Sequence, residues 1–131
     1  MKGIGELVRG LQHVGLPTND LEKTRKFYES LGFQEVYRTR NEAAGEDVSF
    51  LRLGGLTLEV YENGRAQMRS GAIDHLALDV EDVEAAFALV QQLGCPVVSD
   101  GIEFLPFWEK GVRYFTILGP NQERVEFNQY L

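Results

Sequence analysis

The strongest constraint on the fold is an internal repeat, because the segment that begins at His13 recurs from His75. Aligned without gaps, HVGLPTNDLEKTRKFYESLGF lies over HLALDVEDVEAAFALVQQLGC. The identical pairs are His13/His75, Leu16/Leu78, Asp20/Asp82, Glu22/Glu84, Leu31/Leu93 and Gly32/Gly94. Each copy opens with a strand-like run and continues with apolar residues at helical spacing. The repeat therefore predicts two copies of one supersecondary unit.

Each copy contains one predicted helix of about three turns. In the first copy Asn19 is the expected N-cap, with Glu22 three residues further on, as in a capping box. Gly32 and Gly94 are placed to end the two helices in the left-handed conformation. The residues expected on the buried face of the first helix are Leu21, Thr24, Phe27 or Tyr28, and Leu31.

Three strand-like runs follow each predicted helix. They are 33–40, 48–53 and 56–61 in the first copy, and 96–99, 112–118 and 124–128 in the second. LGGL and GPNQ predict hairpin turns before the last strand of each copy. The unit is therefore βαβββ, with one module over about 11–63, a linker over about 64–72 and a second module over about 73–130. We expect a single α+β domain, 1–131, with a curved, mostly antiparallel sheet, helices on its outer face and a concave open face.

Strand alternation places one histidine and one glutamate of each copy on this open face. In LTLEVY the apolar residues alternate with Glu59, and in RVEFN they alternate with Glu126. Because the apolar residues pack under the helix, both glutamates point the other way. The same alternation turns His13 and His75 to the open face, each beside a small residue.

These four residues are candidate metal ligands. A single histidine or glutamate in a strand is usually structural or solvated, but the only two histidines of the chain are equivalent in the repeat, and so are the two glutamates. Two imidazoles and two carboxylates suit Zn, Ni, Co, Fe or Mn, and the ligand types alone do not select among them. The pattern predicts one divalent metal per site, with positions left for water or substrate.

Composition excludes several other classes of function. A net charge of −7 disfavours nucleic-acid binding, because phosphates would be repelled. No run of apolar residues approaches the length of a membrane span, so we expect no membrane partner. Cys95 is the only cysteine, which rules out an internal disulfide and fits a cytoplasmic protein.

The motifs resemble the vicinal oxygen chelate superfamily, which includes glyoxalase, bleomycin-resistance and dioxygenase proteins. The resemblance covers about Leu11 to Tyr130 and rests on HVGLPTNDLEKTRKFYESLGF, LTLEVYEN, IDHLALDV and GPNQERVEFNQ. Within the superfamily, His13, Glu59, His75 and Glu126 are most similar to the ligand set of bacterial glyoxalase I, or lactoylglutathione lyase. The resemblance implies Zn, Ni or Co as the metal and a homodimer as the assembly.

This resemblance also implies a reaction. A lactoylglutathione lyase-like enzyme converts the hemithioacetal of a 2-oxoaldehyde to a 2-hydroxy thioester, by proton transfer through a metal-bound enediolate. Glu126 is the favoured base and Glu59 the second candidate. Asn63 matches a position that contacts the thiol cofactor. Pro17 stands where glyoxalase I typically has a glutathione-contacting arginine, which leaves the thiol open.

The segment DGIEFLPFWEKG has no counterpart in the first copy, and its aromatic residues have two interpretations. Phe104, Phe107 and Trp108, with Leu105, are candidates for a wall of the substrate pocket or, equally, for a dimer contact. Arg113 is a candidate for holding an anionic group of a small-molecule substrate. The alternatives to a lyase are an extradiol-type dioxygenase, an epimerase and a non-catalytic antibiotic-binding resistance module.

Overall fold

A computed structural model describes residues 3–7, 11–71 and 75–131. The chain forms two compact units, residues 1–65 (unit 1) and 66–131 (unit 2). The division falls inside the predicted linker, of which residue 72 lies outside the described residues. Each unit contains a four-stranded sheet. Among the described residues no helix has the length and apolar character that crossing a membrane would require.

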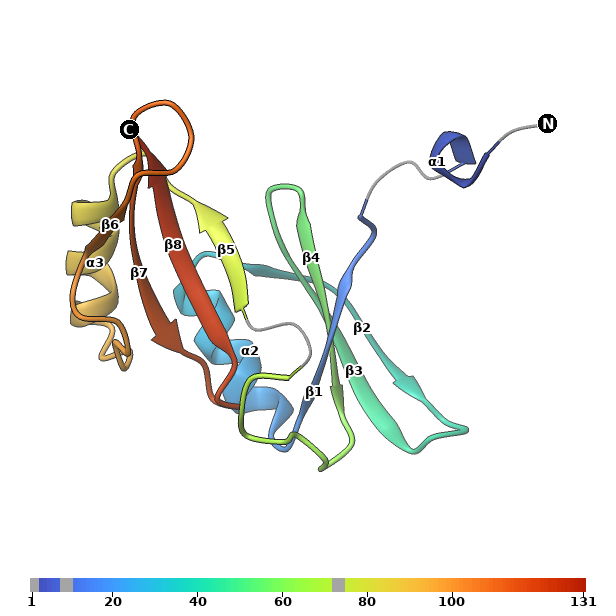
Figure 1. Cartoon of the computed structure of the whole chain (residues 1–131). Helices are drawn as coiled ribbons and strands as arrows, with labels where there is room; N and C mark the ends of the chain where they lie inside the picture. The colour runs from blue at the N-terminus through green and yellow to red at the C-terminus, as the bar shows by residue number, and fades with distance from the viewer. Residues whose placement is uncertain (1–2, 8–10, 72–74) are drawn as a thin grey trace. The chain divides into compact units, whose positions relative to one another are not determined.

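Unit 1 is built around the sheet β1-β4-β3-β2 (Figure 1), and α2 packs against β2, β3 and β4. Its elements are α1 (Ile4–Leu7), β1 (Val14–Thr18), α2 (Leu21–Ser30), β2 (Gln34–Asn41), β3 (Glu46–Leu53) and β4 (Leu56–Glu62). Strand β1 runs parallel to β4, and the other two pairings are antiparallel. The apolar side chains buried in this unit include Leu21, Tyr28, Phe33, Leu51, Leu58 and Val60.

Unit 2 repeats this topology in the sheet β5-β8-β7-β6. Its elements are β5 (His75–Asp79), α3 (Val83–Gln92), β6 (Glu103–Leu105), β7 (Val112–Leu118) and β8 (Arg124–Tyr130). Strands β5 and β8 are parallel and the other pairs antiparallel, while α3 packs on β7 and β8 (Figure 1). The buried apolar side chains are Val83, Val90, Val112, Phe115, Ile117, Val125 and Phe127. The predicted α+β fold of two βαβββ modules is thus confirmed.

Both helices begin in the same way, one repeat apart. The N-cap of α2 is Asp20, whose side chain accepts from the Lys23 N–H at 3.0 Å, so the predicted N-cap Asn19 is wrong by one residue. Asp82 caps α3 identically. A side chain near the end of the last strand also binds the first helical N–H of each unit: Glu62 Oε2 accepts from Leu21 at 2.6 Å, and Gln129 Oε1 accepts from Val83 at 2.9 Å. The last strand therefore fixes the start of the helix in both units.

The predicted strand at 96–99 is wrong. This segment pairs with β7 only around an isolated bridge between Val97 and Ile117, through two backbone hydrogen bonds, and the edge strand of the sheet is β6, in the inserted segment. The reason is local competition for hydrogen bonds. The Thr116 N–H donates to the Ser99 hydroxyl at 2.9 Å, and that hydroxyl in turn donates to the Gly101 carbonyl. The chain therefore leaves the sheet at Ser99 and rejoins it at Glu103.

Candidate metal-binding site

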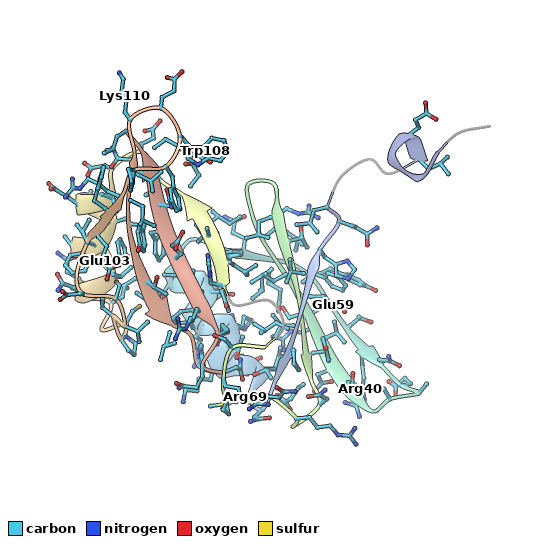
Figure 2. The ribbon with its side chains drawn as sticks, in the orientation of Figure 1. Arg40, Glu59, Arg69, Glu103, Trp108 and Lys110 are labelled. Carbon is cyan, nitrogen blue, oxygen red and sulfur yellow. The ribbon has the colours of Figure 1, made fainter. Side chains whose placement is uncertain are left out.

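Unit 1 presents one of the two predicted His–Glu pairs. His13 lies directly before β1 and Glu59 lies midway along β4 (Figure 2). The His13 Nε2 atom is 4.0 Å from Glu59 Oε1, and both side chains are about one-third exposed. The other ring nitrogen, Nδ1, is 2.9 Å from Oε1 of Gln12. Because an amide oxygen only accepts, this hydrogen bond requires a proton on Nδ1. In the neutral imidazole the lone pair is then on Nε2, which faces Glu59.

Unit 2 presents the second pair. His75 Nε2, from the first residue of β5, is 3.7 Å from Oε1 of Glu126 on β8. The Glu126 side chain is only 15% exposed, which is less than half the exposure of Glu59. Its second oxygen, Oε2, accepts a hydrogen bond from the Asn128 amide at 3.1 Å. One carboxylate oxygen is therefore anchored and the other faces the imidazole.

Identical strand register gives the two pairs the same geometry. In unit 1 Glu59 lies opposite Gly15, two residues after His13, and in unit 2 Glu126 lies opposite Ala77, two residues after His75. Residues two apart on a strand point to the same face of the sheet, and so do residues directly opposite each other on paired strands. The histidine of each pair therefore lies on the same face as its glutamate. Glycine and alanine at these positions leave space beside the imidazole.

The donor atoms fit a divalent metal better than they fit an internal hydrogen bond. Separations of 4.0 and 3.7 Å exceed the usual limit of about 3.2 Å for a hydrogen bond. Two ligand atoms at about 2.1 Å from a tetrahedral ion lie about 3.4 Å apart. Side-chain rotations that move the donor atoms by less than about 1 Å would therefore let either pair bind an ion. Among the described residues no third His, Cys, Asp or Glu joins either pair in a metal-binding cluster.

The unit 2 pair opens into a pocket of about 300 Å³. All the residues that line it belong to unit 2, and they include His75, Ser99, Glu103, Tyr114, Arg124 and Glu126. Of these, only His75 and Glu126 were predicted site residues. Tyr114 and Thr116 could have been found from the alternation of YFTIL, because Phe115 and Ile117 are buried on the helix side. Glu103 could not, since β6 was not predicted.

Tyr114 and Glu103 form a polar pair on the wall of this pocket. The Tyr114 hydroxyl donates to Glu103 Oε2 at 2.8 Å, and Glu103 Oε1 accepts from the Asp100 N–H at 2.9 Å. The Asp100 N–H, followed by the Tyr114 hydroxyl, lowers the pKa of Glu103 below its ordinary value. The same carboxylate raises the pKa of Tyr114. The pair therefore consists of an ionised Glu103 and a protonated Tyr114 at neutral pH.

The structure places Arg113 and Phe104 on the other face of the sheet from Glu126. Arg113 points to the helix side, where its guanidinium pairs with Glu84 of α3 at 2.9 Å. Phe104 is the strand partner of Arg113, and its ring packs over Gly111, although the side chain remains 56% exposed. Neither residue lines the unit 2 pocket, and the substrate contacts predicted for these two positions stay predictions.

Phe107 and Trp108 lie in the loop that joins β6 to β7 (Figure 2 labels Trp108). Both are exposed, at 54% and 77%, and the Trp108 ring makes an edge-on contact with Tyr130 at 5.8 Å between centroids. Neither lines the unit 2 pocket. Asn63 follows β4 in unit 1, and its side-chain oxygen accepts from the Arg65 N–H at 2.9 Å.

Comparison with known proteins identifies the family of this fold. The model of the Glyoxalase/Bleomycin resistance protein/Dioxygenase superfamily matches residues 10–127. The chain belongs to this superfamily. The chain is also 27% identical over 128 residues to the uncharacterized protein YwbC of Bacillus subtilis (strain 168), and the alignment covers 94% of this chain and 99% of YwbC.

Solved structures share the superfamily fold at low sequence identity. A glyoxalase family protein from Enterococcus faecalis superposes with a TM-score of 0.79 at 21% identity, over 93% of this chain and 98% of its own. The fosfomycin resistance protein FosX from Listeria monocytogenes, in complex with Mn(II) and sulfate, gives 0.74 at 19% identity, over 95% and 94%. FosX shows that the vicinal oxygen chelate fold accommodates a divalent metal.

Proposed function

We propose that the chain is a metal-dependent lyase or isomerase of the glyoxalase I type. Its substrate would be the hemithioacetal of a 2-oxoaldehyde, and its product a 2-hydroxy thioester. The observation that carries the proposal is the repeated His–Glu pair, which has the same strand register in both units and an Nε2–Oε1 separation too long for a hydrogen bond. The donors, two imidazole nitrogens and two carboxylate oxygens, suit a divalent transition metal, and the resemblance to glyoxalase I favours Zn, Ni or Co.

His13, Glu59, His75 and Glu126 would together hold one ion per site, whether the two pairs come from one chain or from two copies. When bound, the ion would act as a Lewis acid towards the two oxygens of the substrate. Gln12, as the partner of His13 Nδ1, would keep the Nε2 atom of that ring unprotonated and correctly oriented.

Glu126 would transfer the proton. Its carboxylate takes the proton from the carbon that bears the hydroxyl and sulfur and returns it to the neighbouring carbonyl carbon. The hydroxyl proton passes to the oxygen of that former carbonyl, so the net reaction is an isomerisation. The Asn128 amide supports this role because it anchors Oε2, so that Oε1, when released from or loosely bound to the ion, would move the proton. Glu59 is the second candidate base. It is more exposed, and its side chain accepts no hydrogen bond from any described residue.

Asn63 would contact the thiol-bearing part of the substrate. Its side-chain oxygen is engaged by the Arg65 N–H, but its amide nitrogen donates to no described residue. That nitrogen is therefore available to donate to a substrate carbonyl or carboxylate.

The test combines metal analysis with a kinetic assay of methylglyoxal and several small thiols. Protein purified without chelator should carry a divalent metal, and the metal-free protein should take up Ni, Co or Zn. The Glu126→Gln substitution should lower kcat by about 10²- to 10⁴-fold, the usual contribution of a general base. Glu109→Gln, in the exposed loop between β6 and β7, is the matched control and should leave kcat and metal content unchanged.

Two results would contradict the proposal. One is the absence of bound metal together with no uptake of any of the three ions. The other is full activity in Glu126→Gln at unchanged metal content, which would transfer the role of base to Glu59 or to another residue.

A further inference from the structure

The unit 2 pocket contains polar groups that the proposed proton transfer does not use. Besides His75 and Glu126, its wall includes Glu103, Tyr114 and Arg124. These three side chains come from three adjacent strands, β6, β7 and β8, and line the same pocket as Glu126. Their hydrogen-bonding states define which ligand the pocket can recognise.

The Tyr114 hydroxyl is presented to the pocket as an acceptor. Its proton is directed to Glu103 Oε2 at 2.8 Å, and Glu103 itself is held by the Asp100 N–H at 2.9 Å. Since an ionised carboxylate only accepts, the Tyr114 proton is committed to it. The lone pairs of the phenol oxygen remain for a ligand that donates a hydrogen bond, such as an alcohol.

Arg124 supplies the opposite chemistry. It lies two residues before Glu126 on β8, opposite His75 in the strand register, and its guanidinium forms no hydrogen bond or ion pair with any described residue. Arg113, by contrast, is held by Glu84 on the helix side. A guanidinium without a partner among those residues, on the wall of a pocket, offers the planar donor pair that matches a carboxylate.

The balance of charge in the pocket selects the kind of anion. Glu103 and Glu126 each carry a negative charge, and Arg124 is the one positive side chain among the described residues on the same wall. Repulsion by two carboxylates grows with the charge of the ligand, so a singly charged carboxylate is favoured over a doubly charged phosphate.

We infer that the unit 2 pocket binds a small carboxylate that also carries a hydroxyl group, with the carboxylate on Arg124 and the hydroxyl donating to Tyr114. The inference deepens the proposed function and rests on it only in taking Glu126 as the reacting group. A hemithioacetal already has a free hydroxyl, so the pocket would add a preference for a substrate that bears a carboxylate.

The test uses lactate as a probe. Propanoate is the matched compound that lacks the hydroxyl, and propane-1,2-diol is the matched compound that lacks the charged carboxylate. Binding is followed by NMR amide shifts of the full-length, chelator-treated protein, so neither metal nor turnover is required. Lactate should bind about fivefold more tightly than propanoate, the contribution of one neutral hydrogen bond. It should bind at least about tenfold more tightly than propane-1,2-diol, because the bond to Arg124 is charge-assisted.

Three variants assign these preferences to residues. Tyr114→Phe should remove the difference between lactate and propanoate and keep the affinity for propanoate. Arg124→Gln should remove the difference between lactate and propane-1,2-diol. Arg113→Gln, an arginine of the same sheet on the opposite face, is the control and should alter neither difference. Superposable amide spectra away from the pocket show that each variant is folded.

The inference is overturned by equal affinities for lactate and propanoate in the unmodified protein, or by an unchanged lactate affinity in Arg124→Gln. It is also overturned if lactate at about 50 mM, far above a Kd of about 1 mM, shifts no amide of the pocket. Hemithioacetal turnover without lactate binding would refute this inference alone. Lactate binding with no lyase activity would refute the proposed function alone.

Discussion

Gly111 controls the position of β6, and replacing it by alanine should destabilise the protein strongly. The residue lies directly before β7 with φ +91°, a conformation that L side chains rarely adopt. A Cβ atom there would lie 2.6 Å from Phe104 Cζ, still closer to Phe104 Cε2, and 3.0 Å from the Leu105 carbonyl oxygen. The ring could rotate away, but the backbone oxygen could not move without displacing β6.

The expected cost has two parts. A left-handed conformation costs an L residue about 1–2 kcal/mol, and overpacking typically costs about 1–3 kcal/mol. The Gly111→Ala substitution should therefore lower the free energy of unfolding by about 2–5 kcal/mol. Because β6 carries Glu103, the same shift should weaken its hydrogen bond to Tyr114 and, with it, lactate binding in the pocket.

Urea unfolding, followed by circular dichroism, measures the change. Gly101→Ala is the matched control, because Gly101 has φ +61° but no atom within 4 Å of the point that a Cβ would occupy, so it reports backbone strain alone. The double variant Gly111→Ala/Phe104→Ala separates the two parts of the cost. Without the Phe104 ring, Gly111→Ala should lose the part of its cost that comes from the ring contact and keep the part that comes from the backbone. The effects of the two single substitutions should therefore not add.

Equal costs for Gly111→Ala and Gly101→Ala would refute the reasoning, because they would show that the contacts with Phe104 and Leu105 contribute nothing. Full additivity in the double variant would refute the assignment to the Phe104 ring in particular.

Two further predictions concern unit 1. The hydrogen bonds from Arg25 and then Arg38 lower the pKa of Glu22 from 4.5 to about 2, so the stability that this carboxylate contributes is present above pH 4.5 and is lost as the pH falls towards 2. Glu22→Gln should flatten the pH dependence of the unfolding temperature over that range, and an unchanged profile would exclude the ion pairs as its source. Thr18→Val should lower the free energy of unfolding, measured in urea, by about 1–3 kcal/mol, because the buried Thr24 hydroxyl, 2.8 Å from Thr18 Oγ1, loses this partner. An unchanged free energy of unfolding would contradict a stabilising role of that hydrogen bond.

The elements that the repeat predicted correctly are those whose cause is local. Gly32 and Gly94 end their helices with positive φ, and Leu21, Thr24 and Tyr28 form the buried face of α2. Alternation in β4 and β8 also placed Glu59 and Glu126 correctly, opposite the buried residues of their strands. In each case a period of 3.6 or 2 is sufficient, because the side-chain direction follows from backbone geometry alone.

The errors arose where several local choices have similar energies. Asn19 and Asp20 are both good N-caps, and in the structure the helix that Asp20 caps is also held at Leu21 by Glu62, a residue 41 positions away. The segment at 96–99 has strand character, but the Ser99 hydroxyl takes a hydrogen bond that a strand would need.

The sequence by itself therefore determined the repeated βαβββ architecture and the faces that carry His13, Glu59, His75 and Glu126. Tertiary structure alone decided that Glu103, on the unpredicted strand β6, shares a pocket with Glu126. Alternation assigns Arg113 and Arg124 to opposite faces, but only the structure shows that Arg113 pairs with Glu84 and that Arg124 lines the pocket beside Glu103. The physical reason is that the pocket is lined by strands that are far apart in the sequence. A local period fixes the face of each side chain but does not determine which side chains of different strands lie together.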